Sequence, residues 1–219
     1  MSAFASPTRS NVGGMSQRYV SGGPSVTAVE YLENAGSSGI LLPSIETGIS
    51  VAFRIRWFAP VGNRFAVIVG SKGGADSGVY TQPIPRYAIF DMCNEKERAG
   101  RTMSASAPAA NEWHEGIFSG NVFTIDGVSC SPALKSSVYD SRTNVYSYLG
   151  LFCAWKESAQ SMDEYFVGRI AAFQMWWDGE PVYDLVPVRS GNEGFMLDQT
   201  DGTLYGNAGG GNFLIGPDL

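Results

Sequence analysis

The stretch Ile49-Ser50-Val51-Ala52-Phe53-Arg54-Ile55-Arg56-Trp57-Phe58 decides the fold class, because apolar and polar residues alternate along it. An extended chain places alternate side chains on opposite sides. One side of this stretch would therefore carry the apolar residues Val51, Phe53, Ile55 and Trp57. The other side would carry Arg54 and Arg56. Such alternation predicts a half-buried antiparallel strand whose apolar side faces a core.

The remainder of the chain repeats this strand-like character. Further β-rich runs occupy residues 64–70, 86–91, 121–125, 144–155 and 166–177. In the last run, Phe173, Met175 and Trp177 would face one way, and Gln174 and Trp176 the other. Three Asp-Gly pairs, which favour type I′ hairpin turns, separate strand-like runs at 126–127, 178–179 and 201–202. The sequence predicts an all-β domain over residues 28–219, a two-sheet antiparallel jelly-roll sandwich with almost no helix.

Charge and composition exclude several classes of partner. The chain has 219 residues, with 15 basic and 21 acidic side chains and a net charge of −6. Binding a phosphate backbone requires clustered Lys and Arg, so no nucleic-acid partner is expected. No apolar run approaches 18 residues, so no membrane span is expected. The first seven residues lack a basic region followed by an apolar stretch, so no secretory signal is expected either.

Cysteine and histidine usage gives no sign of a metal or cofactor. Cys93, Cys130 and Cys153 form neither a disulfide framework nor a zinc pattern, so we expect buried, reduced thiols. His114 is the single histidine, which excludes a centre built from several histidines. No G-x-S-x-G elbow accompanies it. A calcium site requires clustered Asp and Asn ligands, and the sequence contains no D-x-D-x-D-G run. We expect no cofactor and no metal.

Residues 1–27 differ from the rest of the chain. They hold six Ser, four Gly and two Pro, no acidic residue, and a charge of +2 from Arg9 and Arg18. Such a segment cannot bury enough apolar surface to offset its own ordering entropy. Two interpretations remain open, a loose terminus and an arm that becomes ordered on a partner. We predict an attachment arm, extended at the N-terminus, whose contacts would include Phe4, Arg9, Arg18 and Tyr19.

Segments at both ends of residues 31–219 resemble a known family. The opening segments are 30–36 and 45–49, and the closing segments are 168–188, 194–198, 204–207 and 211–217. Together they are similar to the concanavalin A-like (LamG-like) jelly-roll domains of phage structural and prophage proteins. In the middle of the chain, residues 72–141, the similarity is limited to the spacing of the strand-like runs. The resemblance implies an architecture and leaves function open, since one fold serves many functions.

The closing segments also have a physical interpretation of their own. Pro187 cannot donate to a strand ladder, so we expect it to end a strand. Asp198, Asn207 and Asn212 are short polar residues beside glycines, and such residues commonly bond to the backbone in irregular turns. We therefore expect them to close the fold rather than to bind a ligand.

Three functions are compatible with such a domain. The first is a non-enzymatic virion protein, a head-decoration, fibre or tail-associated component made in the host cytoplasm. It would bind other virion proteins through its arm and form a homo-oligomer. The second is a carbohydrate-binding module that stacks sugars on exposed aromatic rings, for which Trp113, Trp155 and Trp176 stand in polar or turn-like contexts. A virion lectin would combine both.

The third and least favoured function is a glycoside hydrolase. Such enzymes need two carboxylates flanking the scissile bond. Glu112 with Glu115, and Asp163 with Glu164, are the nearest candidates, and neither pair has the E-x-D-x-x-E spacing of the sandwich-type glucanases. We expect no enzymatic activity. The first function is the prediction, with the carbohydrate-binding module as its alternative.

Overall fold

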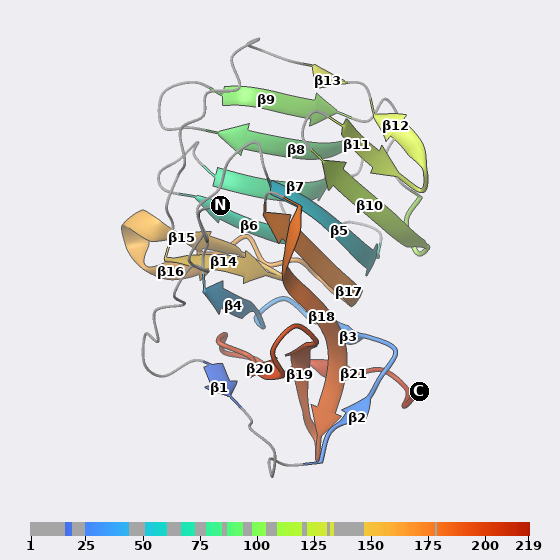
Figure 1. Ribbon diagram of the computed structural model, residues 1–219, viewed down its shortest axis with the longest axis vertical. Coiled ribbons are helices and arrows are strands. Elements are labelled where there is room, and N and C mark those ends of the chain that lie inside the picture. The colour runs from blue at the N-terminus through green and yellow to red at the C-terminus, as the bar shows by residue number, and fades with distance from the viewer. Residues whose placement is uncertain are drawn as a thin grey trace, which may run out of the picture.

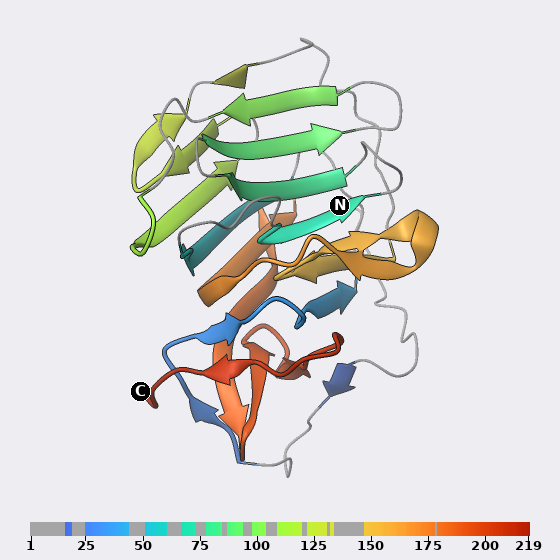
Figure 2. The ribbon, with the colours of Figure 1, turned by 180° about the vertical axis from the view of Figure 1, so that it is seen from behind.

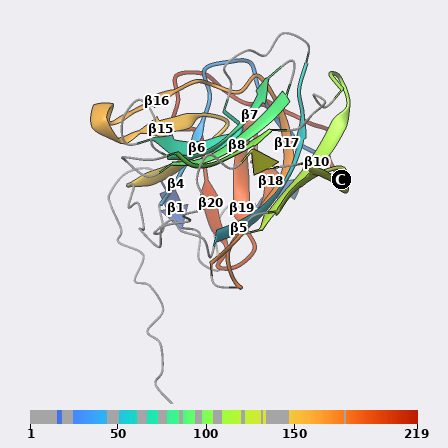
Figure 3. The ribbon, with the colours of Figure 1, turned by 90° about the horizontal axis from the view of Figure 1, so that it is seen from above.

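The chain forms two β-sheets that pack face to face as a sandwich. The computed structural model describes residues 16–18, 25–43, 51–60, 67–72, 78–84, 87–93, 98–103, 109–119, 122–130, 132–133, 147–177 and 179–219. Figure 1 and Figure 2 show the two sheets from opposite sides, and Figure 3 shows both layers from above. Within these residues the helical structure is a single 3-10 turn, η1 (Glu157–Ala159). The predicted all-β sandwich is confirmed.

The larger sheet has twelve strands. Its order is β1 (Ser16–Arg18), β20 (Thr203–Tyr205), β19 (Glu193–Asp198), β18 (Glu180–Ser190), β17 (Gly168–Trp177), β5 (Val51–Phe58), β10 (Trp113–Ser119), β11 (Val122–Ile125) and β12 (Val128–Cys130). β2 (Thr27–Ala28) pairs with β18, and β3 (Leu32–Asn34) lies between β17 and β21 (Leu214–Ile215). The centre of this sheet is therefore β18, β17, β5 and β10.

The smaller sheet has nine strands. Its order is β13 (Pro132–Ala133), β9 (Arg98–Met103), β8 (Tyr87–Cys93), β7 (Gly78–Ile84), β6 (Val69–Lys72), β14 (Tyr148–Leu151) and β4 (Ile40–Pro43). β15 (Ala154–Lys156) pairs with β6 and with β16 (Ser161–Asp163). The β15–β6 ladder is parallel, so the sandwich departs from the predicted antiparallel pairing at this one ladder of the described strands.

The core lies between the sheets and contains the predicted apolar residues of β5. Phe53, Ile55 and Trp57 are each at most 3% exposed, whereas Arg54 and Arg56 are exposed. Val51 belongs to the strand, but its side chain is outside the described part of the chain. From the smaller sheet the core receives Ile40, Leu42, Val69, Leu149 and Leu151, and Ile68 joins them from the position just before β6. The alternation along residues 49–58 therefore predicted the correct face.

The hairpin turns agree with the sequence in part. Asp126 and Gly127 have φ values of 51° and 76°, as a type I′ turn requires. At 201–202 Gly202 has a positive φ and Asp201 does not, and Gly202 N donates to the Asp198 carbonyl at 2.7 Å. The turn that contains Asp201 and Gly202 is therefore longer than a two-residue hairpin turn. Asp178 lies outside the described residues.

Pro187 does not end a strand, contrary to the prediction, because it lies inside β18. On one side it is the register partner of Met196 in β19. Its carbonyl accepts a hydrogen bond from Val29 N at 3.1 Å, beside β2. The N and C=O of one residue point to the same side of an antiparallel strand, so the missing N–H falls on the β2 side. There β18 pairs with a strand of two residues, which makes a proline tolerable.

Two asparagines hold the loops that close the sandwich. Asn34 is fully buried; its Oδ1 accepts from the backbone N of Gly36, Ser37 and Ser38 at 2.8, 3.2 and 2.9 Å. Its Nδ2 donates to the Phe166 carbonyl at 2.8 Å.

Asn207 also accepts hydrogen bonds from the backbone, in the closing segment of the chain. Its Oδ1 accepts from the backbone N of Gly39 and Gly209 at 3.0 and 2.9 Å. Asp198 is buried, and its Oδ1 accepts from the backbone N and the hydroxyl of Thr200. Both residues close the fold as predicted, whereas Asn212 is exposed.

The N-terminal segment contributes two short strands to the larger sheet. Ser16, Gln17 and Arg18 pair with β20, and Thr27 pairs with Arg189 of β18. The arm residues Phe4, Arg9 and Tyr19 lie outside the described residues, and Arg18 is placed by its backbone alone. A boundary at residue 27 and a role in attachment stay predictions.

Candidate functional site

The solvent-facing side of β18, β17, β5 and β10 combines charged, polar and aromatic side chains; we call it the outer face. Its members alternate with core residues along each strand and include Asp184, Gln174, Trp176, Arg54, Arg56, Phe58, Trp113, Glu115 and Ile117. The register places Gln174 and Ile117 on either side of Arg54. Ala172 and Glu115 flank Arg56 in the same way. Residues distant in sequence thereby form one surface.

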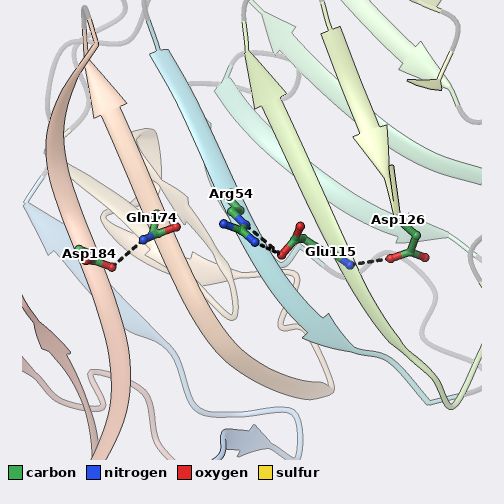
Figure 4. A network of polar contacts seen from close by, with 5 residues as sticks. All are labelled: Arg54, Glu115, Asp126, Gln174 and Asp184. Atoms are coloured by element: carbon green, nitrogen blue, oxygen red, sulfur yellow. Dashed lines mark hydrogen bonds and ion pairs between the residues drawn. The ribbon is translucent and has the colours of Figure 1, made fainter. Parts of the chain in front are cut away.

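A row of polar groups crosses the middle of the outer face (Figure 4). Arg54 Nε and Nη2 both donate to Glu115 Oε2, at 2.9 and 2.6 Å. Gln174 Nε2 donates to Asp184 Oδ1 at 3.0 Å. The side chains of Arg54 and Glu115 are 49% and 37% exposed, so the pair contributes about 1 kcal/mol of stability or less. Its importance is positional, because it fixes donors and acceptors that a ligand in water can reach.

Aromatic rings gather where β5 ends. The Trp113 ring lies 6.0 Å from the Tyr31 ring and 5.8 Å from the Phe58 ring, centroid to centroid. The Arg56 guanidinium carbon lies 5.1 Å from the centre of the Trp113 ring. Trp113 is half-buried. The sequence-predicted Trp113 therefore belongs to the outer face, with a cation over its ring.

Arg169 completes this aromatic end. Its guanidinium carbon lies 4.5 Å from the centre of the Tyr31 ring and 4.9 Å from that of Phe58. Its Nε donates to Glu33 Oε2 at 2.7 Å. A guanidinium that contacts two ring faces and a carboxylate holds Tyr31 and Phe58 in a fixed arrangement.

Trp176 lies toward the other end of the outer face. It is half-buried, and its register partners are Ala52 of β5 and Pro181 of β18. The β17–β18 register shifts between Met175 and Trp176. Trp113 is paired to Phe58 and Trp176 to Ala52, so six steps along β5 separate the two rings by roughly 20 Å. The structure thus places two of the three predicted tryptophans on one face.

The third predicted tryptophan, Trp155, is in the smaller sheet and only 6% exposed, so it offers no ring surface for stacking. Its Nε1 donates to Glu157 Oε2 at 2.8 Å, and the Tyr148 ring meets it edge-on at 5.1 Å. Burial raises the pKa of Glu157, but hydrogen bonds from Ser147, Trp155 and Gln160 outweigh that effect and leave the pKa below its usual value. A hydrogen-bonded, charged Glu157 fixes Trp155 as a structural residue.

His114 is also structural in this arrangement. It is buried on the core side of β10, with its ring 5.7 Å from that of Trp57. Nδ1 lies 2.7 Å from Asp126 Oδ2, and Nε2 lies 2.6 Å from the Ala109 carbonyl oxygen. Both ring nitrogens are therefore engaged in holding the loops that flank β10.

The candidate hydrolase carboxylates do not lie in one strand or sheet. Glu115 is in β10 of the larger sheet and bonds to Arg54, and Glu112 is exposed just before that strand. Asp163 ends β16 of the smaller sheet, and its Oδ1 accepts from Glu164 N at 2.8 Å. One candidate pair therefore lies at the start of β10 and the other at the end of β16.

Two further features are absent from the described residues, a cluster of metal ligands and a membrane-spanning helix. No three His, Cys, Asp or Glu side chains gather there as metal ligands would. The same part of the chain contains no helix with the length and apolar character needed to cross a bilayer.

Comparison with known proteins identifies the fold. Neither a family model nor a curated protein matches the sequence. In structure the chain is similar to a proposed carbohydrate-binding protein from Bacteroides ovatus, with a TM-score of 0.55 and 9% identity over 87% of this chain. The chain spans 60% of the length of that protein.

A native heptameric SAP-like pentraxin from Limulus polyphemus is also similar, with a TM-score of 0.47 and 8% identity over 72% of this chain and 76% of that one. The resemblance of this chain to phage and prophage proteins stays a prediction. What the first likeness establishes is the architecture, a two-sheet jelly-roll sandwich.

Proposed function

We propose that this domain binds carbohydrate on its outer face and catalyses no reaction. The observation that carries the proposal is the position of Trp113 and Trp176 on one solvent-facing sheet surface, with Arg54, Glu115 and Gln174 between them. Sugars present apolar C–H faces to aromatic rings and hydroxyls to polar side chains. The structural similarity to the proposed carbohydrate-binding protein from Bacteroides ovatus is further support.

The two ends of the outer face would have different roles. Trp176 is flanked by the small Ala52 and the flat Pro181, so its ring is the stacking surface. The Arg56 guanidinium lies over the Trp113 ring, so a ligand at this end would contact Arg56 rather than the ring. A separation of roughly 20 Å along β5 exceeds one sugar ring, so the ligand would be an oligosaccharide or polysaccharide.

Isothermal titration against a panel of soluble polysaccharides tests the proposal. For any polysaccharide that binds, Trp176→Ala should weaken binding about tenfold or more, which is about 1.4 kcal/mol. Tyr165→Ala is the matched control, because Tyr165 is a half-buried aromatic residue beside the smaller sheet. No binding to any polysaccharide, or equal losses in both variants, would contradict the proposal.

The absence of catalysis is tested separately. Cleavage would need two carboxylates flanking one bond, whereas neither candidate pair has the spacing of the sandwich-type glucanases and Glu115 is held by Arg54. Incubation with the same polysaccharides should release no reducing ends. Release that Glu112→Gln or Glu164→Gln abolishes would make the domain a glycoside hydrolase.

The virion role, with attachment by residues 1–27, is the narrower setting that we propose for this binding domain. It is supported by the change in composition at residue 27 and by the resemblance to phage structural proteins. A chain that begins at Val26 loses β1, which pairs with β20 over three residues. That truncated chain should fold and fail to join the particle. Full incorporation into particles would contradict the arm.

A further inference from the structure

Resting on the proposed carbohydrate-binding function, we infer that its ligand is an anionic glycan, whose carboxylate or sulfate group Arg56 receives. Three guanidinium groups lie on or beside the outer face. Arg54 bonds to Glu115 at 2.6 Å, and Arg169 bonds to Glu33 at 2.7 Å. Within the described part of the chain, Arg56 contacts the Trp113 ring rather than a carboxylate.

The ladder explains why Arg56 keeps its charge unneutralised. Arg56 and Glu115 are direct register partners on β5 and β10, the positions at which an ion pair is usually found. Glu115 instead reaches diagonally to Arg54, two residues away on β5. The diagonal pair leaves Arg56 exposed and displaced toward the end of the strand, where it lies over Trp113.

A guanidinium supported on an indole ring is well suited to bind an anion. Contact with the ring removes water from one side of the cation, and the planar fork keeps its donors directed outward. Such a fork binds carboxylates and sulfates through two parallel hydrogen bonds, which lysine cannot do. The guanidinium also covers the ring on which a neutral sugar would stack. A ligand at this end therefore meets a positive charge first.

The net charge of the protein cannot account for a preference for anionic glycans, so that preference must come from Arg56 itself. With a net charge of −6 the domain repels polyanions at long range, so nonspecific attraction would not produce anionic binding. An anionic ligand must instead meet Arg56 directly, with its neighbouring sugars along Arg54, Gln174 and Trp176.

Matched pairs of polymers test the inference by titration calorimetry. One pair is polygalacturonate and its fully methyl-esterified form, which share a backbone and differ in carboxylate charge; the other is dextran sulfate and dextran. The wild type should bind one anionic member at least tenfold more tightly than its neutral partner. The pair that shows this preference identifies carboxylate or sulfate as the group bound.

Variants of two arginines complete the experiment. Arg56→Gln should reduce the anionic affinity at least tenfold, to that of the neutral polymer. Arg189→Gln removes the same charge from a half-buried arginine of β18 that pairs with Asp218 and is not a member of the outer face, and it should keep the preference.

The outcomes separate the inference from the proposed function. Equal or better binding of neutral polymers would overturn the inference and leave carbohydrate binding standing. A preference for the anionic member that survives Arg56→Gln would also overturn the inference. If no polysaccharide of either kind binds, carbohydrate binding itself is wrong.

Discussion

Replacing Asn34 by alanine tests how strongly one buried side chain holds the closing loops. Its Oδ1 accepts from three backbone N–H groups, of Gly36, Ser37 and Ser38, and its Nδ2 donates to the Phe166 carbonyl. Four hydrogen bonds at about 1 kcal/mol each give about 4 kcal/mol. Two of the bonded groups are partly buried and can recover water. We therefore expect Asn34→Ala to reduce the free energy of unfolding by about 3 kcal/mol.

Urea unfolding followed by tryptophan fluorescence measures this loss. A lower midpoint with an unchanged denaturant slope would assign the loss to stability. Asn212→Ala is the matched control, because Asn212 is an exposed asparagine in the same closing segment and should cost less than about 0.5 kcal/mol. A loss below about 1 kcal/mol for Asn34→Ala, or equal losses at both positions, would refute the network's contribution.

Three further predictions concern the core and its titratable groups. Phe53→Ala should cost about 3–5 kcal/mol and Arg54→Ala under about 1 kcal/mol in the same urea assay, and similar losses would mean that the β5 faces are misassigned. Burial raises the pKa of the Cys153 thiol from 9.0 to about 12, so the unfolded chain ionises first and unfolding free energy should fall as pH rises from 9 toward 12. Cys153→Ala should remove that part of the pH dependence, and an unchanged slope would argue against the buried thiol. His114→Phe keeps an aromatic side chain but loses both ring-nitrogen hydrogen bonds, so it should lower the free energy of unfolding by about 2–3 kcal/mol, and a wild-type urea midpoint would contradict that role.

Local patterns predicted the elements of the fold well. Alternation assigned Phe53, Ile55 and Trp57 to the core, because burial of one side of a strand leaves a period of two in the sequence. Pro187 was misassigned because the sequence does not reveal what lies beside a strand. The parallel β15–β6 ladder was missed for the same reason, since it joins segments about eighty residues apart.

The candidate site was predicted in part. Alternation placed Gln174 with Trp176, and polar context singled out Trp113, yet nothing in the sequence indicated that β10 lies beside β5. The pairing of Arg54 with Glu115 depends on that register. Trp155 is buried in the structure and donates a hydrogen bond to Glu157, two residues away, and the sequence spacing alone reveals neither.

The position of β3 has a consequence for biosynthesis. Leu32 and Asn34 are fully buried between β17 and β21, and the Asn34 and Asn207 hydrogen bonds join residues 132 and 168 positions apart. At ribosomal speeds of about 5–20 residues per second, β21 emerges roughly 10 to 40 s after β3. During that interval Leu32 lacks its final neighbours and is exposed to aggregation and to chaperones. The sandwich can therefore close only after nearly all of these residues have been synthesised.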